Sequence, residues 1–164
     1  NMYQLSTGEF LRKEMSDKTV IGEKISSVIN TGALVSDEIV SDLIEKVISD
    51  IQYKNRIIFD GYPRNLNQAE NLGKLLKKND QKIDIVLKLS VSLKTIKSRI
   101  LERQNIEKRS DDIEEIAIKR FETYEKSTEP VIEYYKKLNL LKVVDGERPI
   151  DQINNEISDI ISLI

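Results

Sequence analysis

A short apolar run that ends abruptly in Asp-Gly constrains this sequence more than any other stretch. Residues 56–59 contain β-branched and aromatic side chains, which indicates a buried strand. Asp60 and Gly61 follow directly, and open parallel sheets bind their ligands at the carboxyl ends of such strands. Pro63 stiffens the loop, and Arg64 offers a planar guanidinium group that fits a phosphate. The stretch predicts a phosphate site beside a hydrated metal ion, and an ordinary surface turn is the alternative interpretation.

Strands and helices alternate along the whole chain. Besides residues 56–59, apolar runs predict strands over residues 2–5, 83–89 and 140–144. Helical periodicity and capping residues predict helices over residues 6–17, 19–30, 36–51, 65–78, 92–103, 111–127, 131–137 and 149–163, with a break or restart at Pro130. This alternation favours an α/β fold with a parallel sheet covered by helices on both faces.

The composition narrows the possible chemistry. The 164 residues carry a net charge of −2, which argues against a nucleic-acid-binding surface or a polybasic membrane surface. No apolar run approaches the length of a transmembrane helix. The chain has no Cys and no His, so disulfides, Cys- or His-bound zinc and His catalysis are excluded. Phosphoryl transfer fits this composition because it depends mainly on positioned positive charge.

Arginine is used sparingly. Only eight of the 26 basic residues are Arg, and the others are Lys. Arg at these few positions indicates a need for its planar fork of donors, and random scatter is the alternative interpretation.

Five short motifs resemble those of the adenylate kinase family, in the order and at the spacings found there. They are Ser6–Arg12, Thr31–Ser36, Asp60–Arg64 with Gln68 four residues later, Arg99 with Arg103, and Arg109–Asp112 followed by Lys119-Arg120. Each motif is weak alone, but together they cover essentially the whole chain. Six of the eight arginines then occupy positions that the resemblance assigns to nucleotide contact, namely 12, 64, 99, 103, 109 and 120.

The resemblance implies an acceptor site for AMP. Arg12 and Arg64 would hold the AMP phosphate, while Thr7 and Gln68 would contact the adenine. Thr7 and Gln68 favour AMP because similar pyrimidine-monophosphate kinases usually have Ala and Asn there, and a UMP or CMP kinase remains the alternative. The residues implied to contact AMP are Thr7, Arg12, Ala33, Leu34, Val35, Gly61, Tyr62, Pro63, Arg64, Gln68, Arg109 and Arg120.

The resemblance also implies the reaction, which is reversible transfer of a phosphoryl group from ATP to AMP to give two ADP. Mg²⁺ would accompany ATP, with Asp60 orienting it through water. The residues implied for catalysis are Asp60, Arg64, Arg103, Arg109 and Arg120. Those implied to contact ATP are Arg99, which would stack on the adenine, Arg103 and Arg148.

The implied organisation is one kinase domain over residues 1–164, with an AMP-binding subdomain at residues 6–35 and a short lid at residues 102–112. Longer members of the family carry a larger lid, in some cases with Cys-bound zinc, which this chain cannot hold. The resemblance further implies a monomer in the cytoplasm, with small-molecule nucleotides as its partners.

The family begins with a strand and a Gly-x-x-x-x-Gly-Lys-Ser/Thr phosphate loop (P-loop), and this sequence contains neither. In the family that strand is central, between the strand ending at Asp60 and the one around Leu89. The expected fold is therefore a P-loop NTPase-like parallel sheet without its first strand, and we expect that segment to precede Asn1 in the natural protein. A chain truly lacking the loop would be a non-catalytic AMP-binding fragment. A helical interaction protein is disfavoured because an α/β core accounts for the apolar stripes.

Overall fold

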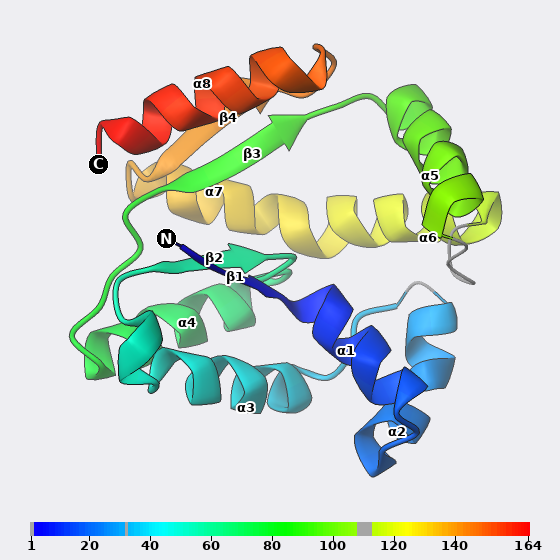
Figure 1. The fold of residues 1–164 in the computed structure, drawn as a ribbon, viewed down its shortest axis with the longest axis horizontal. Helices are drawn as coiled ribbons and strands as arrows, with labels where there is room; N and C mark the ends of the chain where they lie inside the picture. Colours follow the sequence, from blue (N-terminus) through cyan, green and yellow to red (C-terminus); the bar gives the residue numbers. More distant parts are fainter. Residues whose placement is uncertain (1, 32, 108–112) are drawn as a thin grey trace.

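The strands form two separate parallel pairs in the computed structural model, which describes residues 2–31, 33–107 and 113–164 (Figure 1). Strand β1 (Tyr3–Ser6) pairs with β2 (Ile57–Asp60). Strand β3 (Val86–Ser90) pairs with β4 (Leu141–Asp145). Among the described residues β2 and β3 are not paired with each other, and they are the strands that the expected central strand would separate.

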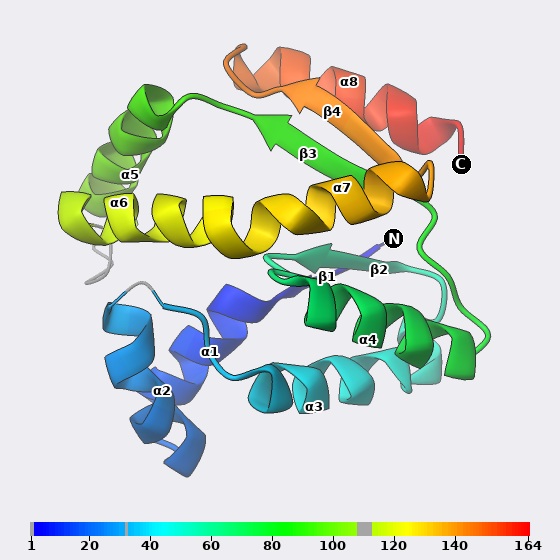
Figure 2. The same cartoon turned by 180° about the vertical axis from the view of Figure 1, so that it is seen from behind.

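Helices surround both strand pairs, as the sequence predicted for an α/β fold. They are α1 (Thr7–Ser16), α2 (Val20–Asn30), α3 (Asp37–Ile48), α4 (Leu66–Lys78), α5 (Leu93–Glu107), α6 (Glu114–Thr123), α7 (Glu129–Lys137) and α8 (Ile150–Ser162). Figures 1 and 2 show α7 and α8 on opposite faces of the β3–β4 pair. Helices α3 and α4 lie along the β1–β2 pair, and α1 leads away from β1 to pack against α2.

Side-chain caps start three of the predicted helices. The Ser6 hydroxyl accepts from the Glu9 backbone N–H, and the Thr19 hydroxyl accepts from that of Gly22. The side-chain Oδ1 of Asn65 accepts from the Gln68 backbone N–H at 2.8 Å. The caps fix where α1, α2 and α4 begin, and the first and last of these positions border the candidate site.

Two predicted helix ends and one helix cap differ from expectation. Helix α3 ends at Ile48, and Ile51 lies in a separate 3₁₀ turn (Ile51–Tyr53), where it is 79% exposed. Ser36 precedes α3 but makes no capping hydrogen bond with its side chain. Helix α5 continues to Glu107, so the first part of the predicted lid is helical, while residues 108–112 lie outside the described residues.

A new helix starts beside Pro130, which confirms the predicted restart. A π-helical turn (Tyr124–Thr128) connects α6 directly to α7, and Pro130 lies in the first turn of α7. Proline is tolerated there because the first N–H groups of a helix have no carbonyl partner within it.

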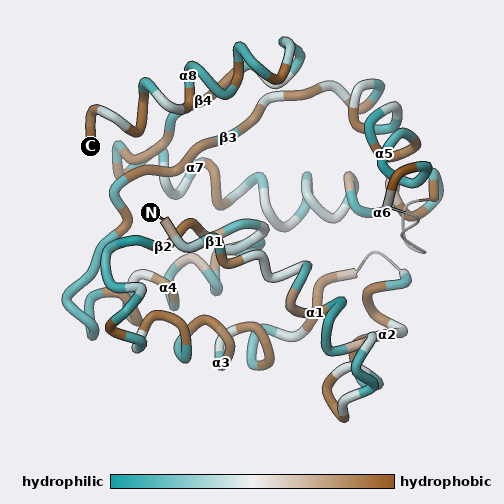
Figure 3. The backbone as a smooth tube through the Cα atoms, in the orientation of Figure 1, coloured by the Kyte–Doolittle hydropathy of each residue, from teal (hydrophilic) through white to brown (hydrophobic). Residues whose placement is uncertain are grey.

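The core consists of two clusters of apolar side chains, and Figure 3 shows hydrophobic stretches in brown along α3 and β3. The larger cluster lies among β1, β2 and α1–α4, with Ile25, Ile44, Ile48 and Leu72 almost fully buried. The smaller cluster contains Ala69, Val131 and Tyr135 and connects α4 with α7. Within the described ranges, no helix combines the length and apolar character needed to cross a membrane.

Candidate functional site

A pocket of about 590 Å³ lies where α1, the segment before α3, the loop after β2 and α6 meet. Its lining residues are Thr7, Gly8, Leu11, Arg12, Ile29, Ala33, Leu34, Val35, Val40, Gly61, Tyr62, Arg64, Gln68 and Arg120. The pocket thus brings together ten of the twelve residues implied for AMP contact. Pro63 is not among the lining residues, and Arg109 lies outside the described residues.

The loop after β2 has a conformation that requires glycine. Gly61 has a φ of 71°, in the left-handed region that residues with a Cβ rarely adopt. A Cβ at Gly61 would lie 2.9 Å from Arg64 Nη2 and 3.3 Å from Thr7 Oγ1. The Gly61 carbonyl accepts from Thr7 Oγ1 at 3.1 Å and from Arg64 Nε at 2.7 Å. The loop therefore fixes both side chains at the pocket.

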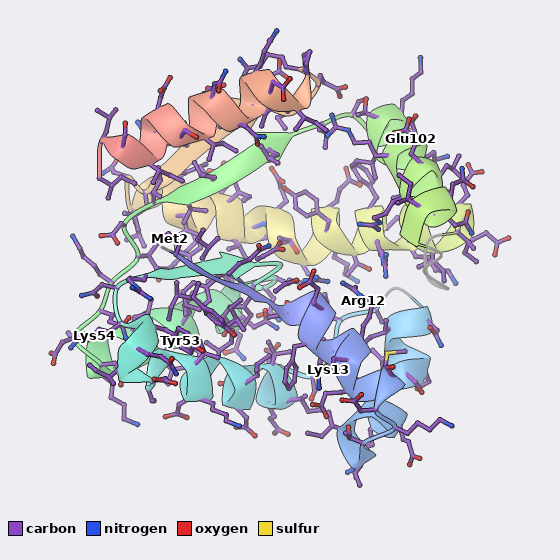
Figure 4. The ribbon with its side chains drawn as sticks, in the orientation of Figure 1. Met2, Arg12, Lys13, Tyr53, Lys54 and Glu102 are labelled. Carbon is purple, nitrogen blue, oxygen red and sulfur yellow. The ribbon has the colours of Figure 1, made fainter. Side chains whose placement is uncertain are left out.

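Three guanidinium groups converge on the pocket from different elements. Arg12 comes from α1 and lies over Gly8, with Nη1 3.2 Å from where a Cβ of that residue would be (Figure 4). Arg64 comes from the loop after β2, and Arg120 comes from α6. Because these residues line one pocket with the same charge, they make it a favourable site for an anion.

Electrostatic interactions at Arg64 reflect this convergence. Burial of the guanidinium group by surrounding protein is the main reason that the pKa of Arg64 is lowered, although part of the residue is exposed to water. The positive charges of Arg120 and Arg12 lower this pKa further, and the Asp60 carboxylate partly offsets them. A phosphate bound here would relieve the repulsion among the arginines.

Two buried polar side chains lie among the apolar residues of the pocket. Thr7 is 3% exposed and Gln68 is 4% exposed. Tyr62 contacts the same region, since its hydroxyl donates to the Gln68 backbone carbonyl at 3.3 Å. Burial raises the pKa of Tyr62 to about 12, and the negative charge of Asp37 contributes to the increase. An apolar pocket with a few oriented polar groups can select a flat heterocyclic ring.

Asp60 lies at the carboxyl end of β2 with its side chain exposed. Its Oδ2 accepts a hydrogen bond from Gln4 Nε2 at 3.0 Å. An exposed carboxylate can also accept hydrogen bonds from water on a magnesium ion, so this residue fits its implied role. Within the described ranges, no cluster of three or more acidic side chains could hold a metal ion by itself.

The three residues implied for ATP contact do not line the pocket, and two of them lie near the turn after β4. Arg99 Nη2 donates to the Gly146 carbonyl at 2.7 Å. Arg148 forms an ion pair with Glu156, and its Nε donates to the Asp145 carbonyl at 3.3 Å. Arg103 lies one turn after Arg99 on α5. The structure therefore groups Arg99 and Arg148 around one turn, at the carboxyl end of β4.

Sequence reasoning missed two kinds of pocket residue. Apolar side chains of Leu11, Ile29 and Val40 line the pocket, but an apolar residue in a helix is more typical of the core than of a ligand site. Asp37, behind the pocket, accepts hydrogen bonds from three side-chain amides, whereas its position after Ser36 indicated only a helix start. The amide-rich run Asn65, Asn67 and Gln68 was the available signal, but it did not identify the acceptor.

The fold is that of an α/β protein, with parallel strands flanked by helices. Its arginine-lined pocket lies at the carboxyl end of a strand, which is typical of the class of α/β proteins that bind anionic ligands. Residues 1–140 match the family model described as adenylate kinase. The chain is 39% identical to an adenylate kinase of Pelagibacter ubique, over 99% of this chain and 89% of that protein. It is 38% identical to one of Porphyromonas gingivalis, over 96% of this chain and 81% of that protein. The chain belongs to the adenylate kinase family, whose members are nucleoside monophosphate kinases.

Proposed function

We propose that this protein catalyses the reversible, magnesium-dependent reaction of ATP and AMP to give two ADP. The observation that carries this proposal is one pocket that combines Arg12, Arg64 and Arg120 with the buried side chains of Thr7 and Gln68. The arginines suit a phosphate, and the buried polar groups suit a base attached to it. Membership of the adenylate kinase family supports the same reaction.

In this proposal the pocket binds the acceptor nucleotide. Arg12 and Arg64 bind the AMP phosphate, and Thr7 and Gln68 contact its adenine. Residues 33–35 pass beside the nucleotide and belong to an AMP-binding subdomain over residues 6–35. Held in this way, the acceptor oxygen needs little further ordering before it attacks the phosphorus atom.

The donor nucleotide binds on the side of α5 and the turn after β4. Arg99, Arg103 and Arg148 contact ATP there. Arg103, Arg109 and Arg120 surround the transferring phosphoryl group, and residues 102–112 form a lid that excludes water from it. Asp60 would hold Mg²⁺ through water, and the ion would supply positive charge at the phosphates.

The test is a coupled assay that measures ADP formation by the intact protein from ATP and AMP in the presence of Mg²⁺. We expect steady ADP production with AMP and much slower turnover with CMP or UMP. Equal or better use of a pyrimidine monophosphate would overturn the assignment of the acceptor. AMP binding with no ADP formation would overturn the proposed kinase activity itself.

A further inference from the structure

The carboxylate of Asp37 accepts three hydrogen bonds from side-chain amides at the start of α4. Its Oδ1 accepts from Gln68 Nε2 at 2.7 Å and from Asn65 Nδ2 at 2.9 Å. Its Oδ2 accepts from Asn67 Nδ2 at 2.9 Å. Asp37 itself does not line the pocket, whereas Gln68 does. The carboxylate therefore acts on the pocket through Gln68.

The two ends of the Gln68 amide have fixed and opposite partners. Its nitrogen donates to Asp37, and its oxygen accepts from the Arg64 backbone N–H at 2.8 Å. An ionised carboxylate can only accept and a backbone N–H can only donate, so rotating the amide by 180° would break both bonds. A free amide rotates easily, whereas this one has a single favourable orientation.

Asp37 is ionised at neutral pH. Burial raises the pKa of its carboxyl group, but the amide hydrogen bonds from Asn67, Asn65 and Gln68 together outweigh burial and lower it. The group therefore remains an acceptor throughout the physiological pH range. Its preference for the nitrogen end of the Gln68 amide does not change with pH in that range.

A fixed amide can distinguish bases by their donor and acceptor pattern. Each polar atom of the Gln68 amide can make one hydrogen bond beyond the bond described above. Adenine presents a donor at N6 beside an acceptor at N1, whereas hypoxanthine presents an acceptor at O6 beside a donor at N1. Only one of these patterns matches a given amide orientation, and the other places donor against donor.

We propose that Asp37 is a positioning residue that fixes the Gln68 amide and so sets the preference for AMP over inosine monophosphate (IMP). This inference rests on the proposed AMP site, because Gln68 must contact the base for its orientation to matter. The mismatch penalises IMP. Without Asp37, the Arg64 backbone N–H would still favour one orientation of the amide, but the energetic difference between the two orientations would decrease, and with it the penalty on IMP.

The test measures binding of AMP and IMP to the intact protein and to Asp37→Ala by calorimetry, with KM and kcat from the coupled assay. Alanine is used because an Asn would keep an oxygen that can accept from Gln68. We expect Asp37→Ala to reduce the AMP/IMP affinity ratio about tenfold, the effect of one buried hydrogen bond. The change should appear in the KM for AMP while kcat is retained, because Asp37 does not touch the reacting phosphates.

Two matched controls separate positioning from general loosening of the α3–α4 contact. Ser41→Ala removes a hydrogen bond in which Asn71 Nδ2 donates to Ser41 Oγ at 2.7 Å, between the same two helices. Asn67→Ala removes an amide from Asp37 but leaves the bond between Asp37 and Gln68. We expect both variants to keep the wild-type AMP/IMP ratio.

A second measurement keeps the inference testable if Asp37→Ala does not fold. In the wild-type protein without nucleotide, NMR should show slow hydrogen exchange for the Gln68 side-chain amide, with exposed Gln152 as the internal reference. Exchange as fast as that of Gln152 would overturn the inference. So would a folded Asp37→Ala variant with the wild-type ratio, or with AMP and IMP weakened equally. Absence of AMP binding to the wild-type protein would instead overturn the proposed function.

Discussion

The hydroxyl group of Thr128 donates a hydrogen bond to the backbone carbonyl of Arg64 at 2.8 Å. Thr128 ends the π-helical turn between α6 and α7, and Arg64 lies in the loop after β2. The bond therefore joins the helix that carries Arg120 to the loop that carries Arg64. It thus links two of the three segments that bring an arginine to the pocket.

Thr128→Val should weaken this connection. The substitution removes the hydroxyl but keeps the shape of the side chain, so we expect a loss of about 0.5–1.5 kcal/mol in the free energy of unfolding. AMP should also bind more weakly, because Arg64 and Arg120 lose their common anchor. Denaturant unfolding and calorimetry measure the two effects. Thr123→Val is the matched control, since its hydroxyl bonds only to the Lys119 carbonyl within α6. Equal effects of the two substitutions would contradict the anchoring role.

Gly61→Ala should disrupt the pocket. The alanine would have to adopt a φ of 71°, and its Cβ would lie 2.9 Å from Arg64 Nη2. We expect a loss of at least about 1 kcal/mol in the free energy of unfolding and much weaker AMP binding. Gly73→Ala is the contrasting variant, because among the described residues no atom beyond the neighbouring residues and backbone of α4 lies within 4 Å of a Cβ at this position. It should stabilise the protein by about 0.5–1 kcal/mol and leave AMP binding unchanged.

Arg64→Ala should separate recognition of the phosphate from recognition of the base. The truncation removes a guanidinium group from the anion site, so AMP affinity should fall by about one to two orders of magnitude. Binding of adenosine, which has no phosphate, should change much less. Calorimetric titration with both ligands measures the difference. Arg56→Ala, at an exposed position just before β2, should leave both affinities intact.

The stability of the protein at low pH should depend on Asp37. Its pKa is lower in the folded state than in the unfolded chain, where an Asp titrates near about 3.9. Its stabilising contribution is therefore fully present above about pH 5 and is lost as the pH falls through the lower, folded-state pKa. Asp37→Asn should show a shallower decrease in unfolding free energy between pH 6 and pH 2 than wild type. Asp42→Asn, exposed on the same helix, provides the comparison.

The sequence predicted the helices and strands because local signals specify them. Ser6, Thr19 and Asn65 cap helices that were predicted to begin there, and the apolar periodicity of residues 65–78 corresponds to a buried face of α4 that contains Leu72, Leu75 and Leu76. The helix predicted over residues 36–51 was too long because apolar spacing continued past the end of α3, and spacing alone does not show where backbone hydrogen bonding stops.

The site was less predictable because most of its geometry depends on contacts between distant residues. The motifs indicated Arg12, Arg64 and Gln68, and their roles remain predictions. No local pattern showed that Asp37 would face three amides about 30 positions later in the chain, or that Thr128 would reach Arg64. Such contacts follow from how α3, α4 and the α6–α7 helix pack together.

The arginines at the pocket have a consequence for how fast nucleotides arrive. The whole chain carries a net charge of −2, so its average field repels an anion approaching from a distance. At physiological ionic strength that field is screened beyond about 8 Å, and an approaching nucleotide responds mainly to the charges near its point of arrival. The positive potential around Arg12, Arg64 and Arg120 then determines the association rate, which should fall as salt is added even though the protein as a whole is acidic.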